Sequence, residues 1–400
     1  MPAISMHDPT LEQAFDDLFE WCRSRDFAGY DPFDALNSRF FQSTPFQHSQ
    51  TARFIWTQLC KRSVLNLRPL LLVPPQKNAK GLALFALAAL ASYRRRKTIE
   101  AETEARQLLD ELWQMRIPDY SGAAWGYNFD WQSRNFFAPQ GTPMIVPTAF
   151  ATRALIEAYE TFADQCFLQM ARSSCEFILT DLKRSAESED EVCFSYSPLD
   201  GTRIFNASLL AGEILAGVGA LTGETELCGL ALSAARYVVR RQGDDGSWVY
   251  GVERGQHWVD NFHTAYVLLS LSTILRSCSG AEVDLDQALR RGYEFWRERF
   301  FLADGWPKYY HDSLYPADAH AAATAIITLT ELQELDCDAL PLAEKIAAWT
   351  IHNLRDRQGF FYYQRRRFYT VHTPYMRWTQ AWMLYALARL LESLLEETAL

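Results

Sequence analysis

The sequence lacks the segments that mark fibrous, disordered or membrane-spanning proteins. Only 19 glycines and 16 prolines occur among 400 residues, and hydrophobic residues make up 48%. The longest uninterrupted apolar run, residues 82–91, falls well short of the roughly 20 residues that cross a bilayer. No basic stretch followed by an apolar one opens the chain, so we expect no signal peptide. This composition predicts a globular protein with no membrane span.

Basic residues and metal-ligand patterns are also scarce. The chain has 39 Lys and Arg against 49 Asp and Glu, a net charge of −10, whereas nucleic-acid-binding proteins usually carry a basic excess. None of the eight cysteines forms a CxxC pair or lies at zinc-ligand spacing from a histidine. We therefore expect reduced thiols in a cytoplasmic protein, with no nucleic-acid partner and no metal site. Nucleotide-binding and metalloprotease motifs are missing as well, and no cofactor is predicted.

What the sequence does contain is a helical repeat of about 57 residues. Apolar helices rich in small residues are predicted from Pro147, Asn206, His263, His320 and Trp378, in steps of 59, 57, 57 and 58 residues, with an earlier one from Ala79. Between them lie more charged helices, near 99–116, 164–183, 224–241, 284–302 and 339–355. One further charged helix is needed, and either 11–25 or 50–63 can supply it.

The two sets of helices differ in composition, and this difference predicts where they lie. Helices that are apolar all round are buried on all sides, whereas helices with a charged stripe face water. Six of each predict an all-α fold, an (α/α)6 toroid with an inner and an outer ring. Residues 1–78 are expected to supply an outer helix and a site loop, and 79–400 the toroid, as one continuous domain. The long links all fall on one face, at the N-terminal ends of the inner helices.

These long loops carry much of the aromatic content, which is 14% of the chain. Aromatic faces stack on a pyranose ring, and Asp, Asn, His and Arg satisfy its hydroxyl groups, so the mixture indicates a sugar ligand. Trp131, Trp258 and Tyr310 are predicted to stack on the ring. For Trp248 and Trp306, which follow a glycine turn, plugging of the toroid is the competing interpretation.

Candidate catalytic residues lie at or before the inner-helix N-termini. His263 and His320 occupy the same repeat position, in the first turn of adjacent inner helices, where the helix dipole favours a neutral imidazole. A neutral histidine can act as a general base, although capping or packing at a helix start is the alternative role. Tyr127, Asp130 and Asp260 are expected to assist.

The inner-helix N-termini and the arginines of the last loop predict a basic pit for an anionic, uronic-acid-type sugar. Solvated arginines paired with neighbouring acids are the alternative. Hydrolysis needs two carboxylates, whereas elimination or epimerisation needs groups that move a proton, and the loops offer both sets. The reaction type therefore stays open. The predicted substrate-binding residues are Trp125, Trp131, Arg134, Arg203, Trp258, Asn261, Tyr310, Tyr363 and Arg377, of which the three arginines would hold the anion.

The repeat and its D-G-x-W/Y turns resemble the six-hairpin (α/α)6 toroid of carbohydrate-active enzymes, such as glucosamine 2-epimerase-like proteins, unsaturated uronyl hydrolases and toroidal polysaccharide lyases. The segments YDPFDALNS (30–38), WGYNFDWQSR (125–134) and DNFHTAYVL (260–268) are similar, more narrowly, to VpsJ-type bacterial exopolysaccharide biosynthesis proteins. The resemblance covers nearly the whole chain. It implies a role in a polysaccharide pathway, with other proteins of that pathway as partners. It does not supply a catalytic mechanism that can be transferred residue by residue.

Two other classes of protein share this fold. One is a non-catalytic glycan-binding or scaffold toroid, which the fold alone does not separate from an enzyme. The other is an isoprenoid cyclase or prenyltransferase-like toroid, because residues 242–248 (QGDDGSW) match the QxxxGxW repeat of triterpene cyclases. That match is clear only once, and Asp284-Leu285-Asp286-Gln287 falls short of the DxDD acid motif.

Overall fold

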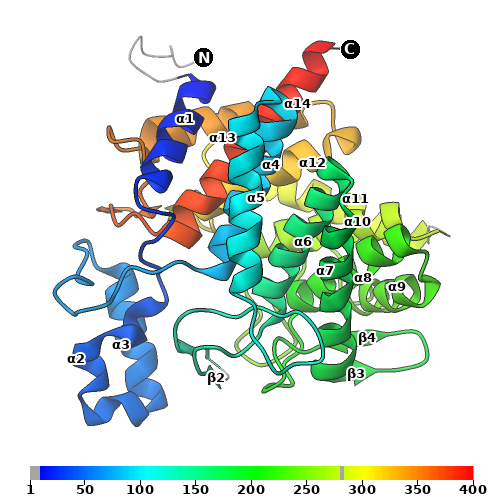
Figure 1. The fold of residues 1–400 in the computed structure, drawn as a ribbon, viewed down its shortest axis with the longest axis horizontal. Helices are drawn as coiled ribbons and strands as arrows, with labels where there is room; N and C mark the ends of the chain where they lie inside the picture. Colours follow the sequence, from blue (N-terminus) through cyan, green and yellow to red (C-terminus); the bar gives the residue numbers. More distant parts are fainter. Residues whose placement is uncertain (1–9, 135, 280–282, 400) are drawn as a thin grey trace.

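The computed structural model describes residues 10–134, 136–279 and 283–399. Within these ranges six long helices form a closed inner ring, in which each helix packs on the next and the last packs on the first. In chain order the inner helices are α4 (Ala79–Arg96), α6 (Ile145–Phe162), α8 (Phe205–Thr222), α10 (Asn261–Ser277), α12 (Ala319–Glu331) and α14 (Trp382–Ala399), the last preceded by a π-helical turn, η5 (Met376–Ala381). Figure 1 shows the arrangement. The predicted all-α (α/α)6 toroid is confirmed.

Each inner helix packs against an outer helix that is its neighbour in the chain, with one exception. α4 pairs with α5, α6 with α7, α8 with α9, α10 with α11 and α12 with α13, whereas α14 pairs with α1 from the other end of the chain. Residues 11–25, and not 50–63, therefore supply the remaining outer helix. The outer helices are α1 (Leu11–Arg23), α5 (Ile99–Gln114), α7 (Gln165–Glu176, continued by the π-helical η3, Phe177–Asp181), α9 (Thr225–Val239), α11 (Val283–Phe300) and α13 (Ala339–Leu354).

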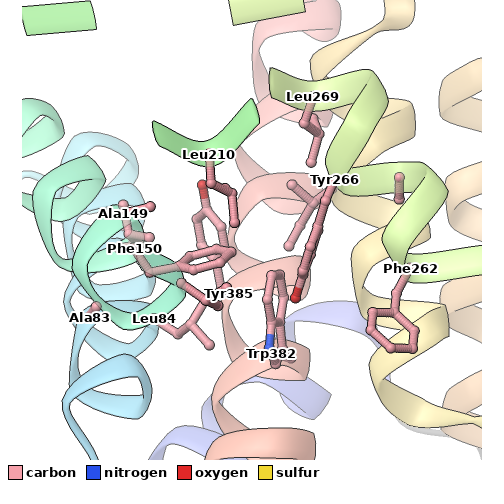
Figure 2. Packing of buried hydrophobic residues seen from close by; sticks show 14 of the residues in the cluster. Ala83, Leu84, Ala149, Phe150, Leu210, Phe262, Tyr266, Leu269, Trp382 and Tyr385 are labelled. Carbon is pink, nitrogen blue, oxygen red and sulfur yellow. The ribbon is translucent and has the colours of Figure 1, made fainter. Parts of the chain in front are cut away.

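Large aromatic side chains fill the centre of the inner ring. Tyr266 and Trp382 are stacked with 5.7 Å between ring centroids, and the Phe150 ring meets Trp382 edge-on at 5.1 Å (Figure 2). Among the described helices, only α8 is apolar and long enough to cross a membrane by composition, and 78% of that 18-residue window is buried. The apolar composition of α8 is explained by its place in the inner ring, where protein surrounds the helix.

The long links between outer and inner helices carry short antiparallel strands. These are β1 (Trp131–Gln132) with β2 (Phe137–Ala138), β3 (Arg184–Glu187) with β4 (Val192–Phe194), and the three-stranded β5 (Ala317–Asp318), β6 (Gln364–Arg365) and β7 (Thr370–Val371). A short 3-10 helix, η4 (Gln333–Leu335), joins α12 to α13 at the other end of the ring. The strands thus lie on the face where the inner helices begin.

A small lobe, residues 34–72, stands outside the ring (Figure 1, lower left). It is built from η1 (Asp34–Asn37), α2 (Arg39–Gln42), η2 (Pro45–His48) and α3 (Gln50–Arg62) with the loop that follows. Arg68 links the lobe to the rest of the protein. Its guanidinium donates to the Asp34 carboxylate within the lobe at 2.6 Å and to the hydroxyl of Tyr375, just before η5, at 2.9 Å. α3 packs on η1, η2 and β1, so this helix belongs to the lobe and not to the outer ring.

A glycine turn in the later links packs each loop against the outer helix of the next hairpin. At Gly305, φ is +89°, and a Cβ atom would lie 2.5 Å from the Lys345 carbonyl oxygen of α13. The aromatic ring after the glycine continues this contact, because Trp306 packs on Trp349 at 4.8 Å. Gly246 and Gly359 occupy the same place in their repeats. Trp306 therefore closes its loop against an outer helix, whereas other aromatic residues fill the centre of the ring.

We expect Gly305→Ala to lower the free energy of unfolding by about 2–3 kcal/mol, because alanine meets both an unfavourable φ and a backbone oxygen. Gly223→Ala is the matched control: its φ is +79°, with nothing within 4 Å of the added Cβ, so it should cost about 1 kcal/mol from φ alone. Urea denaturation measures both. Equal losses would contradict the role of the close approach.

Candidate functional site

A cavity of about 1050 Å³ opens at the N-terminal ends of the inner helices. Its floor follows the repeat, because the second residue of every inner helix, counting α14 from η5, lines it. These residues are Lys80, Val146, Asn206, Phe262, His320 and Arg377. The ring thus places six unlike side chains around one centre, which is how a repeated backbone builds an asymmetric site.

The walls of the cavity come from the long links and from the lobe. The links contribute aromatic residues with polar ends, whereas α3 and the loop after it contribute mainly apolar side chains. On the link side, Tyr250 lies between Trp258 and His263, with 4.5 Å between ring centroids in each case. The Arg134 guanidinium covers the Trp258 ring at 5.1 Å and donates to the Gly255 carbonyl.

His263 and Asp260 form a hydrogen-bonded pair at the start of α10. The Asp260 side chain caps the helix by accepting from the His263 backbone N–H at 2.9 Å. Its other oxygen lies 2.7 Å from His263 Nδ1 and also accepts from Trp258 Nε1. Asp260 is buried, while the His263 side chain keeps 22% of its surface exposed in the cavity. A carboxylate on Nδ1 fixes that proton and leaves Nε2 as the free base.

A second polar group lies deeper in the floor. Lys80 Nζ donates to the Tyr266 hydroxyl at 3.2 Å, and that hydroxyl lies 2.9 Å from His320 Nε2. The Phe262 and Trp382 rings stack on the His320 ring, at 4.7 Å each. Burial, followed by the nearby positive charge of Lys80, holds the pKa of His320 well below its usual range. Burial likewise lowers the pKa of Lys80.

The cavity carries an excess of positive charge. Lys61, Arg62, Lys80, Arg134 and Arg377 line it, and Asp260 is the acid among the described lining residues. Arg377 is neutralised from behind, because its guanidinium donates to both Asp31 oxygens, at 2.5 and 2.8 Å.

Of the remaining cations, Lys61, Arg62 and Arg134 form no ion pair within the described part of the chain. Burial lowers the pKa of Lys61 to about 8. An anionic ligand would therefore meet three cations without an ion-pair partner, of which Lys61 also feels the charges of Asp318 and Asp31.

Most of the residues predicted to act in the site are brought together by the fold. The predicted residues that line the cavity are Tyr127, Trp131, Arg134, Trp258, Asp260, His263, Tyr310, His320 and Arg377. They come from five segments of the chain, and the ring gathers them because every link between hairpins ends on the same face.

Five predicted residues lie outside the cavity lining, each with a partner that holds the scaffold. Trp125 is fully buried and donates its indole N–H to the Leu112 carbonyl. The remaining contacts are Asp130 accepting from the Gln140 backbone N–H, Arg203 pairing with Glu253, Asn261 accepting from the Trp296 indole, and Tyr363 meeting the Tyr375 ring edge-on. These contacts position loops and helix ends.

Several lining residues were not among the sequence candidates. Lys80 carries a usable signal, since it is a lone charge near the start of an otherwise apolar helix and aligns in the repeat with Asn206 and His320. Tyr266 lies one turn beyond His263, on the face that points into the ring. The lining residues of α3, such as Lys61 and Leu59, show no repeat or periodic pattern that points toward the site.

A metal site is offered in one place among the described residues. Asp336, Cys337 and Asp338 could each supply a ligand atom to one ion, but they lie in the turn between α12 and α13, at the end of the ring away from the cavity. Asp336 already accepts from Arg297 and Tyr293. In the cavity, the carboxylate oxygens of Asp260 already accept from His263 and Trp258, so Asp260 is not free for an ion without a change of partner.

The closed ring of helical hairpins, with one cavity over the inner-helix N-termini, defines the (α/α)6 toroid class. Solved structures share it. Cellobiose 2-epimerase from Bacillus thermoamylovorans has a TM-score of 0.61 and 15% identity, over 80% of this chain and 88% of that one. Unsaturated glucuronyl hydrolase from Bacillus sp. GL1 has a TM-score of 0.61 and 13% identity, over 96% of each chain. The Lin0763 protein from Listeria innocua has a TM-score of 0.65 and 10% identity, over 97% and 99%.

Because the sequence identities are low, these likenesses establish the fold and not the activity. No protein-family model matches the sequence, and no curated protein matches it.

Proposed function

We propose that this protein is a carbohydrate-processing enzyme that moves a proton on an anionic, uronic-acid-type sugar. The observation that carries the proposal is the pair formed by Asp260 and His263, whose Nδ1 and carboxylate oxygen are 2.7 Å apart. His263 Nε2 would take a proton from a carbon atom of the sugar. The Lys80–Tyr266–His320 chain would return or accept a proton on the other side, and Asp260 would stabilise the imidazolium that forms.

The carboxylates of the site argue for proton transfer over hydrolysis. A glycoside hydrolase uses two carboxyl groups that flank the scissile bond. Among the described residues that line the cavity, Asp260 is the acid, and it already caps α10 and holds His263. Proteins with similar folds include epimerases and a D-mannose isomerase as well as hydrolases. We therefore favour epimerisation, isomerisation or elimination.

The uncompensated cations support an anionic substrate. Lys61, Arg62 and Arg134 would hold the carboxylate, while Trp131, Trp258 and Tyr310 would contact the ring of the sugar. Because Lys61 is protonated only below its lowered pKa of about 8, the affinity for a uronate should fall as pH rises through that value. A neutral sugar of the same shape should show no such loss.

The test is incubation with uronic-acid and neutral oligosaccharides in D₂O, followed by proton NMR. We expect one carbon-bound proton of the uronic-acid sugar to exchange for deuterium, or to be lost with formation of a double bond. New reducing ends with neither carbon-bound deuterium nor a double bond would indicate hydrolysis and contradict the proposal. Binding without any product over hours would favour the scaffold class, and binding only of a prenyl diphosphate would favour the isoprenoid class.

The sequence resemblance to VpsJ-type proteins extends the proposal to a pathway. The reaction would then serve the biosynthesis of a bacterial surface polysaccharide, alongside other proteins of that pathway. A cytoplasmic location belongs to the same proposal, because a reducing compartment suits eight free cysteines, of which Cys166 and Cys337 are exposed.

A further inference from the structure

One wall of the cavity is apolar and comes from the lobe outside the ring. α3 turns Phe54, Ile55 and Leu59 toward the cavity, and Leu67 and Leu71 follow in the next loop. Ile55 and Leu59 are one helical turn apart on the same face. They remain 51% and 63% exposed. Apolar surface left in water costs about 25 cal/mol per Å², so a stripe of this kind inside a ligand cavity indicates an apolar ligand group.

Apart from Asp34 at its start, which pairs with Arg68, the charges of the lobe are all positive. No Asp or Glu occurs from residue 35 through residue 99, although the whole protein has a net charge of −10. Lys61 and Arg62 end α3, one turn beyond the apolar stripe, and neither forms an ion pair within the described residues. The Lys61 ammonium lies over Phe33 at 4.2 Å and over Trp378, on the ring side, at 5.3 Å. These cations therefore lie between the apolar wall and the polar floor.

From this arrangement we infer that the substrate is an amphiphile, an anionic sugar joined to an apolar chain. The sugar lies over His263 and Tyr310, its anionic group lies beside Lys61 and Arg62, and the chain runs along Ile55 and Leu59. The inference rests on the proposed function for the sugar end and adds the apolar end. Charge complementarity and the continuity of the apolar wall with the catalytic floor support one ligand that spans both.

The test compares methyl and octyl β-D-glucuronide, at concentrations below micelle formation, by quenching of the cavity tryptophans. A buried methylene is worth about fourfold in affinity. If about half of the added chain lies on the wall, the octyl compound should bind roughly 100-fold more tightly. Leu59→Ser should reduce this gain about tenfold without changing the affinity for the methyl compound. The matched control is Leu70→Ser, since Leu70 is in the same lobe, 80% exposed and outside the cavity lining.

A second ligand pair, methyl phosphate and octyl phosphate, separates this inference from the proposed function. If only octyl phosphate binds more tightly than its methyl counterpart, and Leu59→Ser lowers this gain, an amphiphilic ligand would be supported. The proposal that its polar end is a sugar would then be rejected. Equal binding of the short and long members of both pairs, or no binding by any of the four, would overturn the inference. A gain lowered by Leu70→Ser and not by Leu59→Ser would overturn it as well, because the apolar contact would then be a lipid surface against the outside of the lobe.

Discussion

Replacing Asp260 by asparagine is expected to lower turnover about 10²–10⁴-fold, the range for loss of a general base. Asparagine can still cap α10 through its oxygen, so the helix should remain folded. Its NH₂ group, however, would then face His263 Nδ1 and the Trp258 indole N–H, where the carboxylate oxygen accepts from both. His263 would have to accept on Nδ1 and carry its proton on Nε2, which removes the base from the cavity.

The measurement is turnover together with the melting temperature of each variant. Asp164→Asn is the matched control, because Asp164 also caps a helix, α7, by accepting from the Cys166 N–H, at the other end of the ring. It should leave turnover within about threefold of the wild type. His263→Gln should show the same loss as Asp260→Asn, and the double variant no further loss. An Asp260→Asn enzyme with more than a third of wild-type turnover would remove the pair from the mechanism.

The second large effect is expected for stability. Asp31→Asn should lower the free energy of unfolding by about 3–5 kcal/mol, the usual cost of removing one partner of a buried ion pair. Asp31 and Arg377 are 5% and 3% exposed, and the guanidinium donates to both carboxylate oxygens. An asparagine would leave a buried positive charge without a counter-charge. The pair also joins the N-terminal segment to η5, so its loss should loosen the closure of the ring.

Chemical denaturation of single and double variants tests this prediction. Asp31→Asn combined with Arg377→Gln should recover part of the stability, because no unpaired charge remains. An exposed pair supplies the control: Asp286→Asn, which breaks a contact with Arg290, both partners being largely solvent-exposed, should change stability by less than about 0.5 kcal/mol. A loss at Asp31 no larger than at Asp286 would contradict the argument.

The ring itself could be predicted because its determinants are periodic. Burial on all sides selects apolar, small-residue helices, and this selection recurs every 57 to 59 residues from Pro147 onward. The partner of α14 could not be chosen, since 11–25 and 50–63 are both helical and amphipathic. Only the closure of the ring in three dimensions shows which of the two helices is the outer one. The residues that meet at this closure, such as Arg355 and Asp17, are 338 positions apart in the sequence.

The candidate site could be predicted at helix starts and less well within loops. His320 is the second residue of α12, whereas His263 is the third residue of α10, so the predicted equivalence of the two histidines in the repeat is off by one residue. Both side chains still line the cavity, because each lies in the first turn of an inner helix. A loop residue has no period, and Trp125 and Trp131, six positions apart, point to the core and to the cavity respectively. The lobe was the least predictable part, because its cavity-facing residues, such as Leu59, are fixed by contacts that Arg68 and Trp56 make elsewhere.

The pairing of α1 with α14 has a consequence for how the protein is made. α1 is synthesised before the inner helices, and its buried face, which includes Phe15 and Leu18, gains the inner helix that it packs on only when α14 has been synthesised. The other hairpins are local and can form as they emerge, whereas this one must wait for nearly the whole chain. Arg377, which completes the cavity floor, also arrives late. A chain synthesised only as far as α13 thus carries most of a toroid but an incomplete cavity floor.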